Sequence, residues 1–413
     1  MNRDAAPARL QNEPKPREDG GGQNESLSRS SMLLLLAVAA ASAGQTAILA
    51  FLPSLVDDGQ VPLSLRAHDF HVASLSAAHP LAALLFAPVW GWLADRMDYR
   101  IILRSALIVL PLALVPVGAV ALPTLYLLRI LAGMSAAAII PLALLSTGFA
   151  GGGRTEQARH FIWLTAFVFL GDLSAPLLAE VSGVVFPQAP LLMLSAFVAT
   201  IAMLMMFARL PARGSAVSRG GDREAPSLPN TSILLLVTVV GGGGLAAMHV
   251  SLLVTRAEGS LTRETIAWML SLCGLAMLAA QLFHTRVSWL VTAPRLLACL
   301  TLALLAASLF VFPYGSSMFG VAALTVVAGW SSASLRLVTS FWISGPVLPS
   351  GWKLGLQHAA ASIGQVLGPM AIALAGPGEQ SLILPGIAWV SILLLVALPL
   401  VWRRRPDSIK ATA

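Results

Sequence analysis

Charged residues are scarce in this chain. Asp, Glu, Lys and Arg make up 11% of its 413 residues, against about 25% in a typical soluble domain, while 57% of the residues are hydrophobic. Mean hydropathy is +0.80. Apolar runs of roughly 20 residues, the length that crosses a bilayer core, recur along most of the sequence. The composition therefore does not fit a soluble globular protein and predicts that most of the chain lies in a membrane.

Cysteines and catalytic motifs are scarce as well. Cys273 and Cys299 both lie inside apolar runs, so no disulfide framework is expected. The glycine run 241–244 lacks the Lys-Ser/Thr that completes a phosphate-binding loop, and we find no nucleophile–base constellation. We therefore expect no enzyme activity, no ATP-driven transport within this chain and no bound cofactor. One polar cluster is too loosely spaced to indicate a metal site: Asp57, Asp58, His68, Asp69 and His71.

Basic residues outnumber acidic ones, with a net charge of +7 and a pI of about 10.2. A nucleic-acid-binding protein gathers such charge on one soluble face. Here the charge is scattered between apolar runs, as in signals that orient membrane segments, so we expect no nucleic-acid partner. When alternate connectors are assigned to opposite sides, one side holds only Arg66, Arg256 and Arg263. The positive-inside rule then predicts that both termini lie in the cytoplasm. We expect the membrane to be the plasma (inner) membrane.

The apolar runs predict an all-α polytopic membrane protein with twelve spanning helices. A polar connector at 211–231 separates an N-terminal six-helix bundle (31–210) from a C-terminal one (232–403). The flanking tails are 1–30, which we expect to be disordered, and 404–413. Ala41-Ser42-Ala43 leaves open a cleaved signal peptide, although the first apolar run continues past this site. The predicted spans are 32–55, 71–94, 101–121, 124–149, 159–183, 189–210, 232–254, 264–284, 294–313, 316–342, 354–376 and 381–402.

An internal repeat supports the division into two halves. In span five, Gly171 is followed after three residues by a small residue and then Pro176; in span eleven, Gly364 is followed in the same way by Gly368 and Pro369. These spans occupy equivalent positions if the halves are parallel repeats. Because glycine permits close helix approach and proline permits bending, we predict that both spans are flexible elements at the interface between the halves.

The connector after span two carries a dense set of charges, in the sequence GWLADRMDYRIIL from Gly91 to Leu103. This stretch resembles the signature of the major facilitator superfamily, Gly-x-Leu-Ala-Asp-Arg-x-Gly followed by two basic residues. It departs from the signature at Asp98, which stands in place of glycine, and at Tyr99, which stands in place of a basic residue. Asp tolerates a left-handed turn better than most residues, so we expect the turn to be kept.

Two further matches resemble exporters of that superfamily. Span four contains Arg129 followed by Gly133, similar to the Arg-x-x-x-Gly signature of that helix. The Gly-x-x-x-Ala-Pro of span five resembles the antiporter motif of drug–proton exporters. The resemblance covers residues 31–405 and implies two six-helix bundles that expose a central cavity alternately to each side of the membrane.

The connector motif is a candidate gate, comprising Gly91, Asp95, Arg96 and Arg100. Asp95 ends span two, and a carboxylate there can stabilise the positive N-terminal end of a neighbouring helix. The resemblance implies that this neighbour is span eleven, which begins near Trp352. Alternatively, these charges only orient the helices.

Asp172 and Arg129 are the candidates for proton coupling. Asp172 is the only acid in the middle portion of a span, and a carboxylate isolated in apolar surroundings can exchange protons near neutral pH. A charge at the depth of Arg129 needs a cavity or a partner, and the resemblance implies a role in proton coupling. A purely structural role, as partners of each other or of another helix, remains open for both.

Further residues are cavity candidates because the resemblance implies that spans one, four, seven and ten line the cavity: Gln45, Thr46, His249, Trp330 and Arg336. Arg336 can either reach the membrane interface or bind an anionic substrate. His249 can equally be a packed, hydrogen-bonded histidine. The Ala/Leu/Met-rich interior would suit a poorly selective cavity, and it would equally suit helices that face lipid.

We therefore predict a secondary transporter that works as a monomer by alternating access and exports small molecules in exchange for protons. Its partners are the substrate, protons and the lipid bilayer, and its energy source is the proton gradient. Two alternatives remain open: a dedicated exporter of an anionic metabolite or siderophore, and a receptor on the same scaffold that does not transport.

Overall fold

A computed structural model describes residues 20–57, 65–115, 117, 120–148, 154–186, 189, 191–208, 210, 231–257, 262–315, 317–344, 350–375 and 379–401. These ranges contain helices and no strand. Each predicted span contains one long helix. The spanning helices are α1 (Gly20–Thr46), α3 (Leu65–Ala94), α4 (Tyr99–Leu114), α5 (Leu122–Gly148), α6 (Arg154–Val185), α7 (Leu192–Phe207), α8 (Thr231–Ala257), α9 (Arg263–Arg286), α11 (Pro294–Val311), α12 (Met318–Ser344), α13 (Gly351–Leu374) and α14 (Gln380–Val401).

Shorter helices connect some of these elements, namely η1 (Leu49–Phe51), α2 (Leu52–Asp57), α10 (Trp289–Thr292) and η2 (Phe312–Tyr314). Eight of the described helices are long and apolar enough by themselves to cross a membrane, and Ser30–Thr46 and Leu192–Phe207 form shorter apolar helices. Helix α13 does not meet this criterion, although it has 24 residues. Several of its polar side chains, such as Gln357 and Ser362, are instead buried against other helices.

The first predicted span is wrong at its C-terminal end, whereas its beginning at residue 32 agrees with the apolar helix Ser30–Thr46. Helix α1 stops at Thr46, and the chain turns through η1 into α2 instead of continuing as one helix to residue 55. Pro53 explains the break, because a proline ring inside a helix collides with the carbonyl group four residues earlier. At the other end, residues 20–30 are helical and not disordered. Helix propagation adds one hydrogen bond per residue, so a packed helix can extend into a polar segment.

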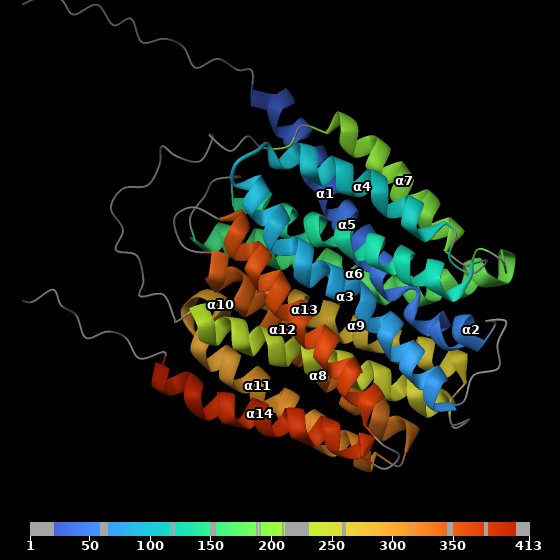
Figure 1. The fold of residues 1–413 in the computed structure, drawn as a ribbon. Coiled ribbons are helices and arrows are strands. Elements are labelled where there is room, and N and C mark those ends of the chain that lie inside the picture. Colours follow the sequence, from blue (N-terminus) through green and yellow to red (C-terminus); the bar gives the residue numbers. More distant parts are fainter. Residues whose placement is uncertain are drawn as a thin grey trace, which may run out of the picture.

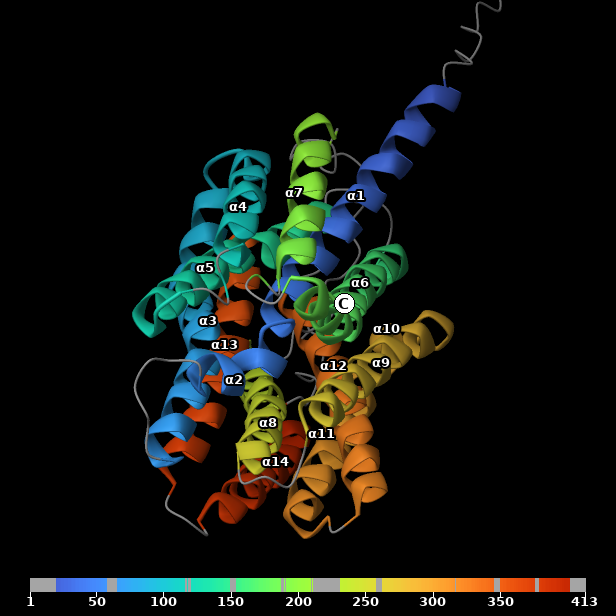
Figure 2. The ribbon, with the colours of Figure 1, turned by 90° about the vertical axis from the view of Figure 1, so that its right-hand side faces the viewer.

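The helices form two halves, with α1 and α3–α7 in the first and α8, α9 and α11–α14 in the second (Figures 1 and 2). The pairs α3–α13 and α6–α9 join the halves, whereas α1–α6 and α8–α13 pack within them. Most of the predicted central connector, 211–230, and the terminal segments 1–19 and 402–413 lie outside the described residues. The boundaries predicted for these parts stay predictions.

The repeated glycines of spans five and eleven hold each half together. A Cβ atom on Gly171 would collide with the backbone carbonyl of Ala39 in α1, and one on Gly364 with that of Val239 in α8. A Cβ atom on Gly368 would likewise collide with the carbonyl of Gly243. The close approach predicted from the sequence is present, and the glycine contacts lie within each half. Helices α6 and α13 themselves lie between the halves, as predicted, through the pairs α6–α9 and α3–α13. A glycine in the sequence predicts that two helices can approach closely, but it does not predict which helix is the neighbour.

Candidate substrate cavity and gate

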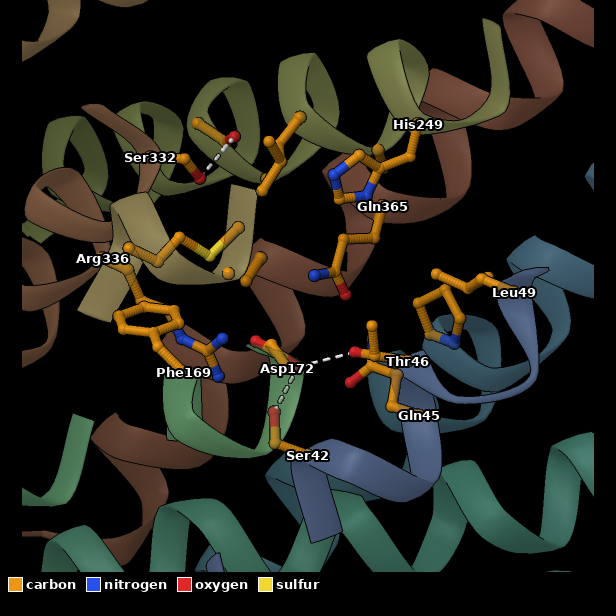
Figure 3. A pocket seen from close by; sticks show the side chains of 18 of the residues that line it. Ser42, Gln45, Thr46, Leu49, Phe169, Asp172, His249, Ser332, Arg336 and Gln365 are labelled. Carbon is orange, nitrogen blue, oxygen red and sulfur yellow. Dashed lines mark hydrogen bonds between the residues drawn. The ribbon is translucent and has the colours of Figure 1, made fainter. Parts of the chain in front are cut away.

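A cavity of about 110 Å³ lies between the two halves. Its wall combines residues of α1, α5 and α6 from the first half with residues of α8, α12 and α13 from the second (Figure 3). The lining is more polar than the Ala/Leu/Met-rich composition suggested, because many of the apolar side chains cover the outer surfaces of the helices. Its polar side chains include Ser42, Gln45, Thr46, Arg129, Asp172, His249, Arg336 and Gln365.

Asp172 is held in this wall by two hydroxyl groups. Ser42 Oγ donates a hydrogen bond of 2.7 Å to Asp172 Oδ1, and Thr46 Oγ1 donates one of 2.6 Å to the same oxygen. Within the described part of the chain, Oδ2 accepts no hydrogen bond. Ser42 was missed as a site residue, although it lies four positions before Thr46, a spacing that places both hydroxyls on one helix face. The carboxylate is thus fixed by one oxygen and uncommitted at the other.

Arg336 reaches toward Asp172 from α12, in the other half (Figure 3). The two charges interact electrostatically, but no ion pair within 4.0 Å joins them in the described structure. The guanidinium group also forms no hydrogen bond with any described residue. Arg336 therefore lies on the cavity wall, and the two roles predicted for it stay predictions.

Arg129 is buried, with 3% of its surface exposed, and the backbone satisfies part of its guanidinium. Its Nε donates to the carbonyl of Leu75 at 3.3 Å, and its Nη1 donates to that of Gln45 at 3.4 Å. It lines the cavity and makes no ion pair with Asp172 among the described residues. Arg129 therefore contributes positive charge to the cavity and does not neutralise Asp172 directly.

The remaining cavity candidates divide into two groups. Gln45, Thr46 and His249 line the cavity, and His249 Nε2 is buried without a hydrogen-bond partner in the described structure. Trp330 is not part of the lining. Its ring packs against Phe283, with 5.5 Å between the ring centroids. Trp330 and Arg336 are six residues apart on α12, so the two side chains face different directions.

Asp95 caps the beginning of α13. Its Oδ1 accepts a hydrogen bond from the backbone N–H of Gly351 at 2.9 Å, and its Oδ2 accepts one from the N–H of Trp352 at 2.9 Å. Ser350 Oγ also donates to Oδ2, at 3.1 Å. These contacts join Asp95, the residue that directly follows α3, to the backbone N–H groups at the beginning of a helix in the other half. A negative charge is stabilised at that position.

Gly91 brings the two backbones together at the same point. A Cβ atom here would collide with the carbonyl of Gly351, so no larger residue fits without moving α3 or α13. A similar close contact follows one turn further along, where Gly355 packs on the backbone of Ala87. The halves are therefore in direct backbone contact beside Asp95.

Among the described residues, the two arginines of the predicted gate make only local contacts. Arg96 is exposed and lies over the Trp92 ring, 3.8 Å from its centroid. Arg100 Nε lies 3.8 Å from Asp98 Oδ1. The expected left-handed turn at Asp98 is absent: the residue is extended, with φ −70°, and its Oδ1 accepts a hydrogen bond from the N–H of Arg100 at the beginning of α4. Aspartate is among the preferred residues at this capping position, which explains its presence in place of glycine.

No group of three or more His, Cys, Asp or Glu side chains within the described ranges could hold a metal ion. His68 contacts Asp69 and the carbonyl of Pro53, and His71 contacts the hydroxyl of Tyr126. Asp58 lies outside the described residues.

Comparison with known proteins assigns the fold and the family. The family model of the Major Facilitator Superfamily matches residues 34–258, more than half of the chain. The chain belongs to this superfamily of membrane transporters. The predicted fold, two bundles of six spanning helices, is thereby confirmed. Membership in the drug–proton exporter branch does not follow from this match.

Solved structures share the fold at low sequence identity. The human organic anion transporter MFSD10 (TETRAN) is 16% identical with a TM-score of 0.71, and the match covers 90% of this chain and 99% of that one. The proton:xylose symporter XylE, bound to 6-bromo-6-deoxy-D-glucose, is 11% identical with a TM-score of 0.67, and the match covers 92% and 100%. No curated protein matches the sequence.

Proposed function

We propose that this transporter couples the movement of a small molecule to the movement of protons. The observation that carries the proposal is Asp172, a carboxylate midway along α6 whose Oδ2 atom is uncommitted on the cavity wall. A proton carrier must reach the substrate cavity and lie away from bulk water, and Asp172 meets both conditions. The proton gradient would then supply the energy, without a cofactor.

We propose export across the plasma (inner) membrane as the direction, with both termini in the cytoplasm and a single chain as the working unit. The support is the exporter-like motif around Gly171 and Pro176 and the one-sided distribution of basic residues. The fold alone leaves the direction open, since one of the similar structures is described as an organic anion transporter and another as a proton:xylose symporter.

Export is tested by substrate accumulation in cells that overproduce the chain. The panel contains cationic dyes, neutral drugs and acidic metabolites, each measured with and without an uncoupler. We expect at least one compound to accumulate less in overproducing cells, and the difference to disappear when the uncoupler collapses the proton gradient. A compound that binds the purified protein but whose accumulation never changes would favour the receptor alternative. No change for any compound would contradict export.

We further propose that the contact between Asp95 and α13 is a cytoplasmic gate. It joins α3 to α13 across the two halves, at the end of the molecule that the charge distribution assigns to the cytoplasm. Closing this end leaves the cavity accessible only from the opposite side, and breaking the contact would permit opening inward.

The gate is tested with a cysteine introduced at Ala361, on the cavity wall, in a chain whose Cys273 and Cys299 are replaced by alanine. Asp95→Ala should speed labelling from the cytoplasmic side about fivefold, which corresponds to the ~1 kcal/mol that a charge contributes at a helix end. Asp98→Ala is the control, because Asp98 caps α4 without contacting the other half. Equal labelling in both variants would contradict the gating role of Asp95.

A further inference from the structure

The cavity presents opposite charges from its two walls. Asp172 belongs to the first half and Arg336 to the second, and the two interact electrostatically without closing into an ion pair within 4.0 Å. Each has polar atoms without partners among the described residues: Oδ2 of Asp172 and the guanidinium nitrogens of Arg336. A ligand between them would therefore meet a free acceptor on one side and free donors on the other.

The charge of the ligand decides whether both walls can be satisfied together. A simple anion bound at Arg336 brings a negative charge close to the Asp172 carboxylate, and a simple cation bound at Asp172 brings a positive charge close to Arg336. Like charges that lie close together repel each other, most strongly in surroundings from which water is excluded. A ligand with one charge of each sign avoids both conflicts and can form charge-assisted hydrogen bonds at both ends.

We propose that the substrate of this cavity is a small zwitterion, whose carboxylate binds Arg336 and whose ammonium group binds Oδ2 of Asp172. The cavity volume of about 110 Å³ suits a compact molecule of this class. Arg129, which lies on the wall of the first half with Asp172, adds a second positive charge to the cavity. The inference rests on the proposed function, in which Asp172 exchanges protons.

The proposal explains how binding and proton movement would be linked. The ammonium group and a proton compete for the same oxygen of Asp172, so substrate binding displaces the proton and protonation displaces the substrate. This competition is what exchange of a substrate for a proton requires. The charged and titratable groups around Asp172 that bear on this linkage are Arg336, Arg129, His249 and Cys273.

The test measures calorimetric binding to the full chain in lipid nanodiscs. Glycine, β-alanine, γ-aminobutyrate and δ-aminovalerate carry the same two charges at increasing separation. Valerate replaces the ammonium group of γ-aminobutyrate by a methyl group, and isohexylamine replaces its carboxylate by an isopropyl group. At least one zwitterion should bind about tenfold or more tightly than either single-charge probe, which equals the ~1.4 kcal/mol of one charge-assisted contact. Its affinity should fall on acidification.

Two variants distinguish a site that recognises both charges of the ligand from a general loss of protein structure. Arg336→Gln should weaken zwitterion binding and improve isohexylamine binding, because the repelling cation is removed. Asp172→Asn should weaken zwitterion binding and improve valerate binding, and it should remove the effect of acidification. Glu156→Gln, an exposed acid at the beginning of α6, is the control and should change none of these values.

The outcomes that would contradict the zwitterion proposal differ from those that would contradict proton coupling. Valerate binding that exceeds that of every zwitterion and tightens on acidification would overturn the proposal in favour of a simple anion, while leaving proton coupling intact. Preference for isohexylamine would overturn it in favour of a cation, and absence of binding by all four zwitterions would also overturn it. Tight, acid-sensitive zwitterion binding without any proton movement in vesicles would sustain the inference and contradict the proposed proton coupling.

Discussion

Helices α6 and α13 occupy equivalent places in the two halves, and they share a packing contact but not a charge. Gly171 packs on Ala39 in α1, close to the backbone nitrogen of Ala43, and Gly364 packs on Val239 in α8, close to that of Gly243. The same four-residue spacing of contacts recurs in both halves. The contact that both halves share is a close approach of two helix backbones, and it requires only that Gly171 and Gly364 have no side chain.

The next residue of each helix faces the cavity, and here the halves differ. Asp172 follows Gly171, and Gln365 follows Gly364. The glycine contacts align Ala39 of α1 with Val239 of α8. In this alignment, Gly242 corresponds to Ser42, and Ala246 corresponds to Thr46. The first half therefore has both the carboxylate and the two hydroxyls that hold it, and the second has neither. The packing is common to both halves, whereas the proton coupling that we propose for Asp172 is confined to one.

Replacing the shared glycines should have the largest effect. Gly171→Ala and Gly364→Ala each place a Cβ atom against a backbone carbonyl, which cannot move as a flexible side chain can. Such overpacking costs about 1–3 kcal/mol or more, so both variants should unfold at clearly lower temperature than the parent, by similar amounts. Thermal unfolding of the purified protein in detergent measures this.

Gly386→Ala is the matched control, because a Cβ atom on Gly386 in α14 has no neighbour within 4 Å. It should leave stability unchanged or slightly higher, since alanine favours helix by up to ~1 kcal/mol. If only one of the two shared glycines mattered, the packing equivalence of α6 and α13 would be wrong.

Removing the hydroxyls should have a smaller effect, confined to the first half. Ser42→Ala and Thr46→Val each remove a hydrogen bond that stabilises the ionised carboxylate of Asp172. Hydrogen bonds to charged groups are worth about 1.5–3 kcal/mol, so each variant should move the midpoint of the pH–transport profile upward by about one pH unit. The profile is measured in vesicles over a range of pH.

The control for the hydroxyl variants is Ser146→Ala. Among the described residues, the buried Ser146 hydroxyl forms a hydrogen bond only with the carbonyl of Ala143 in its own helix. An unchanged profile in Ser42→Ala and Thr46→Val, or the same change in Ser146→Ala, would show that these hydroxyls do not tune the proton site.

Much of this architecture could be predicted from the sequence, because membrane spans depend on composition and length alone. Each predicted span contains a long helix, including 264–284, which corresponds to α9. Gln281 is fully buried there because Thr165 and the carbonyl of Ala333 satisfy its amide. The contact of Asp95 with the beginning of α13 was also predicted, from the resemblance of 91–103 to the superfamily signature.

Other features depend on which helix faces which, and the sequence does not contain this information directly. Trp330 was expected in the cavity and lies against Phe283. Helices α6 and α13 lie between the halves as expected, but their glycines contact α1 and α8 within each half. The break after Thr46 could have been predicted from Pro53. Ser42 could have been found from its spacing to Thr46, once Asp172 was known to face α1.

The central claim, that the proton travels on Asp172 and not on its counterpart Gln365, is tested most directly by proton movement in proteoliposomes. A substrate gradient is imposed with a compound identified by the accumulation panel, and the internal pH is followed for the parent, Asp172→Asn and Gln365→Asn. We predict that Asp172→Asn abolishes substrate-driven proton movement while substrate-for-substrate exchange persists, and that Gln365→Asn retains proton movement. Proton movement that survives Asp172→Asn at the parental rate would contradict the account.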